Sequence, residues 1–249
     1  MNRRRKPPLN KLKEGCTDPE TIPFPFHMSA HPIQPARSGL PPIILNLLIA
    51  NIMVFILQMA FPGPSGRVGP VDLYGRLYPM GTEYFYPWQL LTYGFLHSTT
   101  TFFHIFINMF VLVMFGRELA DEWGTVRFLV YYLLCIVGAG ATHLGYMELS
   151  GIGYPVLGAS GGTFGILLAF GMRFPHREVM LLIPPIPMKA RTLVIAYGAI
   201  ELLLGVSSLR TGGSSVAHFA HLGGLITGLI VLLYWRGKLP LKPKRPMIW

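Results

Sequence analysis

Six long apolar segments dominate this sequence and limit what it can fold into. They cover roughly residues 43–62, 102–116, 126–147, 159–173, 192–208 and 216–235. A helix needs about 20 predominantly apolar residues to cross a bilayer, and backbone in hydrocarbon must satisfy its own hydrogen bonds. The segments therefore predict an all-α membrane protein, a bundle of six transmembrane helices. We expect the shorter segments to begin below the membrane surface, beside a polar cavity.

The composition agrees with a membrane protein. Hydrophobic residues make up 51% of the chain and charged residues 13%, whereas a soluble domain carries about 25% charged residues. The mean hydropathy is +0.46. A net charge of +10 would suggest nucleic acid as a partner, but the basic residues flank apolar segments and form no patch with interleaved aromatics. We therefore expect a lipid bilayer around the chain and no nucleic acid partner.

The positions of lysine and arginine predict the orientation. With the N-terminus in the cytoplasm, 18 of the 21 basic residues fall inside, and only Arg67, Arg76 and Arg210 fall outside. This asymmetry follows the excess of lysine and arginine that cytoplasmic loops carry. We therefore expect both termini in the cytoplasm. We also expect a multi-pass protein of a cell membrane, specifically a bacterial inner membrane.

The chain is expected to divide into three parts. We predict a flexible basic tail over residues 1–40, a six-helix core over 41–236 and a second basic tail over 237–249. The first forty residues lack the apolar stretch of a cleavable signal peptide.

Polar residues recur near the outer ends of the second, fourth and sixth segments. These residues are His104 and Asn108, Ser160, and His218 and His221. Polar groups inside a membrane segment are expensive, so their common depth suggests one shared site. His104 and Asn108 are four residues apart, hence on one helical face, and both can donate hydrogen bonds to a developing oxyanion. The alternative is a polar pair that joins two helices.

Two stripes of small residues at spacing four explain how a serine could meet a histidine. One comprises Gly161, Gly165 and Ala169, and the other comprises Ala220, Gly224 and Gly228. Such stripes let transmembrane backbones approach closely. If they face each other, Ser160 comes within hydrogen-bond reach of His221, which can activate it as a nucleophile. Gly158 would free the backbone before the helix, whose first N–H groups lack intrahelical partners. Alternatively, the stripes serve packing alone.

Three motifs together resemble the rhomboid family of intramembrane serine proteases. They are "HIFIN" at 104–108, "GASGG" at 158–162 and "AHLGGLITG" at 220–228, in the order in which the family carries them. The resemblance implies a rhomboid-like bundle with a catalytic dyad of Ser160 and His221. It implies that His104, Asn108 and the Ser160 amide stabilise the oxyanion. It also implies cleavage of transmembrane proteins near the outer surface, often after a small residue, without metal or cofactor.

Two positions depart from the pattern of many relatives. The first outer loop of many relatives carries a Trp-Arg pair, and this chain has Trp88-Gln89. Phe164 stands where many relatives carry a tyrosine that packs under the catalytic histidine, so the resemblance implies stacking without the hydroxyl. The supporting residues are expected to be Gly158, Gly161, Phe164, Gly224 and Gly228.

Other functions stay open from the sequence. The G-x-S-x-G pattern of soluble hydrolases also fits "GASGG", but it needs a buried strand that membrane segments exclude. A metal or haem protein could use His104, His218 and His221. An inactive rhomboid-like protein could bind membrane clients without cleaving them. The natural substrate and the oligomeric state are not determined by the sequence.

Glu201 is the one acidic residue deep within an apolar segment. Counting from Arg191 and from Trp235, and taking these two residues at equal depth, places Glu201 about one helical turn below His221. We therefore predict that Glu201 does not complete a triad. We expect a protonated carboxyl that points into the bundle and hydrogen-bonds a neighbouring helix.

Overall fold

A computed structural model of the chain describes residues 39–64, 68–151, 153–181, 185–211, 217–244 and 246–248. Its elements in chain order are α1 (Pro42–Ala60), α2 (Pro70–Gly75), α3 (Gln89–Thr92), the 3-10 helix η2 (Tyr93–Phe95), α4 (Phe102–Trp123), α5 (Thr125–Ser150), α6 (Ser160–Arg173), β1 (Glu178–Met180), β2 (Pro187–Lys189), α7 (Ala190–Thr211) and α8 (His218–Trp235). The tail predicted over 1–40 lies outside the described residues, except for its last two.

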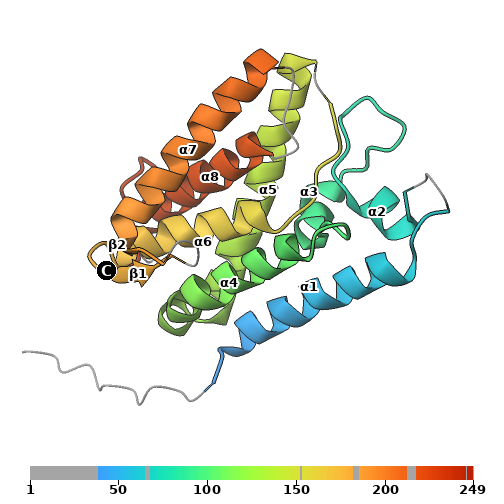
Figure 1. The fold of residues 1–249 in the computed structure, drawn as a ribbon. Coiled ribbons are helices and arrows are strands. Elements are labelled where there is room, and N and C mark those ends of the chain that lie inside the picture. Colours follow the sequence, from blue (N-terminus) through green and yellow to red (C-terminus); the bar gives the residue numbers. More distant parts are fainter. Residues whose placement is uncertain are drawn as a thin grey trace, which may run out of the picture. The chain divides into compact units, whose positions relative to one another are not determined.

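Six long helices form one bundle, and each occupies one of the predicted apolar segments (Figure 1). α5 packs against α4, α6 and α8. Its residues Phe128, Tyr131, Tyr132 and Ile136 are completely buried and supply much of the core. The predicted helical character is confirmed, but the protein is not all-α, because β1 and β2 pair as a short antiparallel hairpin before α7.

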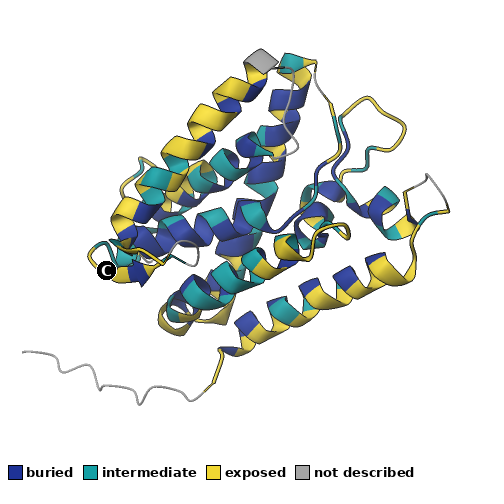
Figure 2. Ribbon diagram, viewed as in Figure 1, coloured by how far each residue is buried: buried dark blue, intermediate teal, exposed yellow. Residues whose placement is uncertain are grey.

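Five of the described helices are long and apolar enough to cross a membrane. They are α1, α4, α5, α7 and α8. α6 has only 14 residues, which span about 21 Å, so it falls short of the length predicted for a full crossing. α6 is also the most enclosed helix, buried along most of its length, whereas α1 and α7 present exposed faces (Figure 2). Apolar residues such as Ile49 and Leu203 form these exposed faces, as expected of surfaces that contact lipid.

The ends of α4 and α6 meet at one end of the bundle. Arg173 pairs with Glu122 at 2.7 Å, and Arg177 pairs with Glu118 at 2.9 Å. The sequence predicted an apolar segment ending at 116, but α4 continues to Trp123. The apolar run stops earlier because these last two turns carry charges that pair with Arg173 at the end of α6 and with Arg177 just beyond it.

Buried Gln58 fixes the long connection between α1 and α4. Its Nε2 donates to Asp72 Oδ1 and to the carbonyl oxygen of His97, both at 2.9 Å. Its Oε1 accepts from the backbone N–H of His97 at 2.9 Å. The end of α1 therefore holds the chain in place a few residues before α4.

Trp88 and Gln89 organise the aromatic part of this connection. Gln89 is completely buried, and its Oε1 accepts from the backbone N–H groups of Tyr78 and Tyr86 while its Nε2 donates to the carbonyl of Tyr84. Trp88 stacks on Tyr86 at 4.4 Å. The glutamine thus gives the loop an internal scaffold although the Trp-Arg pair is absent.

Candidate active site

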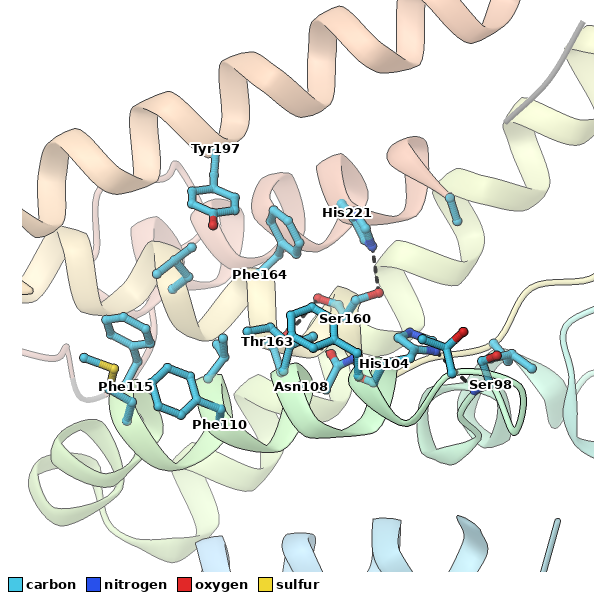
Figure 3. Close-up of a pocket in the computed structure, with 18 of the residues that line it drawn as sticks. Ser98, His104, Asn108, Phe110, Phe115, Ser160, Thr163, Phe164, Tyr197 and His221 are labelled. Atoms are coloured by element: carbon cyan, nitrogen blue, oxygen red, sulfur yellow. Dashed lines mark hydrogen bonds between the residues drawn. The ribbon is translucent and has the colours of Figure 1, made fainter. Parts of the chain in front are cut away.

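Ser160 and His221 lie against each other at the centre of the bundle. Ser160 Oγ is 2.8 Å from His221 Nε2 (Figure 3). Ser160 is the first residue of α6, and His221 lies in the first turn of α8. Two residues far apart in the chain thus have the geometry of a nucleophile and its general base.

The small-residue stripes bring these two helices together, but the contact is shorter than the three small residues in each stripe would allow. A Cβ atom on Gly224 would overlap the backbone of Gly161, so α6 and α8 touch there backbone to backbone. Further along, Gly165 packs against Cys135 and Gly228 against Tyr131, both on α5. The stripes therefore face α5 as well as each other, because α5 lies against both helices.

Gly158 shapes the approach to α6. Its φ of +133° is one that residues with a side chain rarely adopt, and a Cβ there would lie 2.9 Å from His104 Nε2. Its N–H donates to the carbonyl of Tyr93 at 2.9 Å. Both the backbone conformation and the available space therefore require glycine beside His104.

One hydrogen bond fixes the tautomer of the neutral His104 ring. The backbone N–H of Ser98 donates to His104 Nδ1 at 3.2 Å, so in the neutral ring the proton lies on Nε2. Nε2 is the atom beside Gly158, near Ser160. His97 meets His104 edge to face at 5.3 Å, and burial lowers the pKa of His97 to about 4, so this neighbour is uncharged near neutral pH. His104 thus offers an N–H donor to the cavity.

Asn108 is oriented by two hydrogen bonds. Its Nδ2 donates to the carbonyl of His104 at 2.8 Å, and its Oδ1 lies 3.2 Å from Thr163 Oγ1. Thr163 Oγ1 is also 3.1 Å from the carbonyl oxygen of Ser160. Thr163 is a site residue that the sequence motifs did not single out. Its position three residues after Ser160, on the same helical face, was the available signal.

Phe164 stacks on His221, as the family resemblance implied. The ring centroids are 4.4 Å apart, and the planes differ by 12°. Tyr197 of α7 meets the other side of Phe164 edge to face at 6.3 Å. The stack restrains the imidazole plane without a hydroxyl.

The position of Glu201 differs from the one predicted by counting residues along the two helices. It points into the bundle and contacts a neighbouring helix as expected, with Oε2 2.6 Å from His218 Nδ1. Its Oε1, however, is 3.0 Å from His221 Nδ1, so the expected gap of one turn is wrong. The count treated Arg191 and Trp235 as equally deep, and an offset of a few residues between them removes a gap of roughly 5 Å. With two imidazoles beside it, Glu201 is not the isolated carboxyl that the prediction assumed.

A cavity of about 730 Å³ opens over Ser160 and His221. Ser160, His104 and Asn108 belong to its polar part, while side chains such as Phe110 and Phe115 form an apolar wall (Figure 3). The cavity is bordered by α4, α6 and α7. An extended peptide with apolar side chains fits this mixture of a polar floor and apolar walls.

The residues that could share a metal ion are not those that the sequence suggested. Among the described residues, Glu201, His218 and His221 bring ligand atoms within 4.8 Å of one another. His104 is not part of this group, which argues against a site built from His104, His218 and His221. The contacts that join the three residues also occur in ordinary hydrogen-bonded networks.

The chain is similar in sequence to proteins that are named as rhomboids. The chain is 32% identical over 139 residues to a yeast protein named rhomboid protein 1, mitochondrial; the match covers 55% of this chain and 39% of the yeast protein. It is 26% identical over 210 residues to rhomboid protease GlpG of Yersinia pestis, over 82% of this chain and 66% of that protein. It is 30% identical over 146 residues to the zebrafish presenilin-associated rhomboid-like protein A, mitochondrial, over 55% of this chain and 37% of that protein.

The chain thus spans less than two thirds of the length of each of these relatives. A family model described as Rhomboid domain matches residues 85–238, which include all three motifs and the helices from α3 to α8. Together with the apolar helices, this match identifies the chain as a multi-pass membrane protein. It belongs to the rhomboid family.

Proposed function

We propose that this chain is an intramembrane serine endopeptidase that hydrolyses peptide bonds in or near transmembrane segments of membrane proteins. The observation that carries the proposal is the 2.8 Å contact between Ser160 Oγ and His221 Nε2 beneath a partly apolar cavity. The name of the Yersinia relative, a rhomboid protease, supports the same activity. The names of the mitochondrial relatives do not state one.

The reaction would proceed by acyl transfer. Ser160 Oγ attacks the carbonyl carbon of the scissile bond while His221 Nε2 takes the hydroxyl proton. The oxyanion would accept hydrogen bonds from His104 Nε2 and from the first N–H groups of α6, with Asn108 alongside. The imidazolium then returns the proton to the leaving amine, and the C–N bond breaks. Water hydrolyses the acyl-enzyme, again with His221 as base, and frees Ser160.

The surroundings support a substrate that is itself a membrane protein. The cavity lies among helices whose outer faces are apolar, so a segment that crosses the same bilayer can reach it without leaving lipid. We further propose cleavage after small residues, as the family resemblance implies. We propose six crossings with both termini in the cytoplasm, because the distribution of basic residues favours that orientation. We also propose a bacterial inner membrane as the location.

The test uses purified protein in lipid with a generic single-span substrate. Wild type should release two fragments and should react with a serine-directed fluorophosphonate at Ser160. Ser160→Ala should do neither while unfolding at the same temperature as wild type, since it removes only the nucleophilic oxygen. Binding of the substrate without cleavage by wild type would instead favour an inactive, client-binding rhomboid. Cleavage retained in a clean Ser160→Ala preparation would refute the serine mechanism.

A further inference from the structure

We propose that Glu201 is a positioning residue for His221, and that His218 anchors it. This inference rests on the proposed protease function. The carboxylate lies between two imidazoles of α8, with Oε2 2.6 Å from His218 Nδ1 and Oε1 3.0 Å from His221 Nδ1. Ser160, His221, Glu201 and His218 thus form one continuous chain of polar contacts.

The chemistry of the base requires such a partner. His221 Nε2 must be free of its proton to accept one from Ser160, so in the neutral ring Nδ1 carries the proton. A buried N–H that lacks an acceptor costs about 1–3 kcal/mol. His221 Nδ1 is buried and has no well-aligned hydrogen bond in the structure, and Glu201 Oε1 lies 3.0 Å away, off the direction of the N–H. A small rotation of the carboxylate or the ring aligns the bond and fixes the tautomer that the base needs.

His218 explains why the carboxylate stays in place. His218 precedes His221 by three residues, so the two rings share one face of α8. The contact from His218 Nδ1 to Oε2 is the shorter of the two, and both residues are buried. His218 therefore holds one oxygen, which leaves the other oxygen directed at His221.

A packing role alone does not account for Glu201. The neighbouring residues Leu202, Leu203 and Leu204 are exposed apolar side chains, and a leucine would suit a membrane helix better than a carboxyl does. Ionisable residues inside membrane segments are expensive, and they occur where they pair with a functional group. The group that Glu201 meets is the proposed base.

The experiment measures cleavage kinetics and the rate of fluorophosphonate labelling for wild type and four variants. Glu201→Gln preserves shape but replaces one of the two carboxylate oxygens with an NH2 donor, so only one of the two positions can still accept from an Nδ1–H group. Glu201→Asp preserves the charge on a shorter side chain. His218→Asn removes the anchor. Ser208→Ala is the matched control, because Ser208 is buried on the same helix and its hydroxyl donates to the carbonyl of Gly205 instead.

For Glu201→Gln we expect kcat to fall by about 10²-fold or more, since loss of the acid that orients a catalytic histidine costs up to about 10⁴ elsewhere. The labelling rate should fall in parallel, whereas KM and the unfolding temperature should stay near their wild-type values. Glu201→Asp should recover part of the rate, His218→Asn should cause a smaller loss than Glu201→Gln, and Ser208→Ala should match wild type.

Four results would overturn the inference. Glu201→Gln with near wild-type kcat and labelling would remove Glu201 from the mechanism, as would a loss of rate that merely follows a loss of folded protein. A defect in KM alone would assign Glu201 to substrate binding. If wild type itself is neither labelled nor active, the proposed protease function fails first and this inference falls with it. If wild type is labelled normally and Glu201→Gln is labelled equally fast, the positioning role of Glu201 fails while the protease function stands.

Discussion

Gly224 lies so close to Gly161 that a Cβ atom on Gly224 would overlap the carbonyl oxygen of Gly161. The helix that carries the proposed nucleophile and the helix that carries its base therefore touch without any side chain between them. Ser160 directly precedes Gly161, and His221 precedes Gly224 by three residues. The separation of the two helices at this point sets the distance between the reacting atoms.

Gly224→Ala is expected to push α8 away from α6. The backbone of Gly161 cannot yield as a flexible side chain would, so we expect a destabilisation of about 1–3 kcal/mol. A misplacement of about 1 Å can cost 10²-fold in rate, and we expect a loss of that order in kcat. Thermal unfolding and substrate cleavage measure the two effects.

Gly145→Ala is the control for this substitution. Gly145 lies in α5, and a Cβ there meets nothing within 4 Å, so the variant should keep its activity and its stability. Equal behaviour of the two alanine variants would mean that the contact between Gly161 and Gly224 does not set the geometry of the site.

His104→Ala and Asn108→Ala should slow cleavage without abolishing it. The Nε2 of His104 and the amide of Asn108 line the cavity beside Ser160, and loss of one oxyanion donor typically costs about 10²–10³ in kcat. Each variant should stay more active than Ser160→Ala. Steady-state kinetics in lipid provide the measurement. If neither substitution alters kcat, the two residues join helices only.

Phe164→Tyr should behave like wild type, whereas Phe164→Ala should lose activity. The ring of Phe164 stacks on His221 at 4.4 Å, and such an aromatic contact is worth about 0.5–1.5 kcal/mol. If that energy is expressed in the transition state, kcat/KM falls by up to about tenfold. Wild-type kinetics in Phe164→Ala would show that the other contacts of His221 suffice to orient it.

Chelators should leave the cleavage rate unchanged, because the proposed mechanism uses no metal. The test is informative since Glu201, His218 and His221 could together hold an ion. Treatment with a chelator, followed by metal analysis of the protein and an activity assay, distinguishes the two cases. Reversible loss of activity together with a stoichiometric metal would favour a metalloenzyme.

The sequence was sufficient for the positions of the six long helices and for the proximity of Ser160 and His221. The first follows from long apolar runs, and the second from small residues at every fourth position, which allow close helix contact. The ends of the helices were less predictable. α4 continues beyond its apolar run because Glu122 pairs with Arg173, the last residue of α6, and Glu118 pairs with Arg177 just after it.

Contacts between side chains of different helices were the least predictable. The meeting of Glu201 with His221 depends on the relative offset of α7 and α8, and no periodicity within either helix reports that offset. The hydrogen bonds of Gln89 were equally unpredictable, because they join the side chain to backbone groups within an irregular loop. Thr163 was missed because one hydroxyl in an apolar helix usually satisfies itself locally.

The 14 residues of α6 have a consequence for the second half of the proposed reaction. The helix is shorter than the hydrocarbon layer, which is about 30 Å thick, and α4, α5, α7 and α8 surround it. These neighbours separate α6 from lipid, so α6 itself need not extend to both surfaces. Hydrolysis of an acyl-enzyme consumes one water molecule per turnover, and hydrocarbon supplies none. In the proposed reaction, the cavity that Ser160 lines at the first residue of α6 must therefore also admit this water.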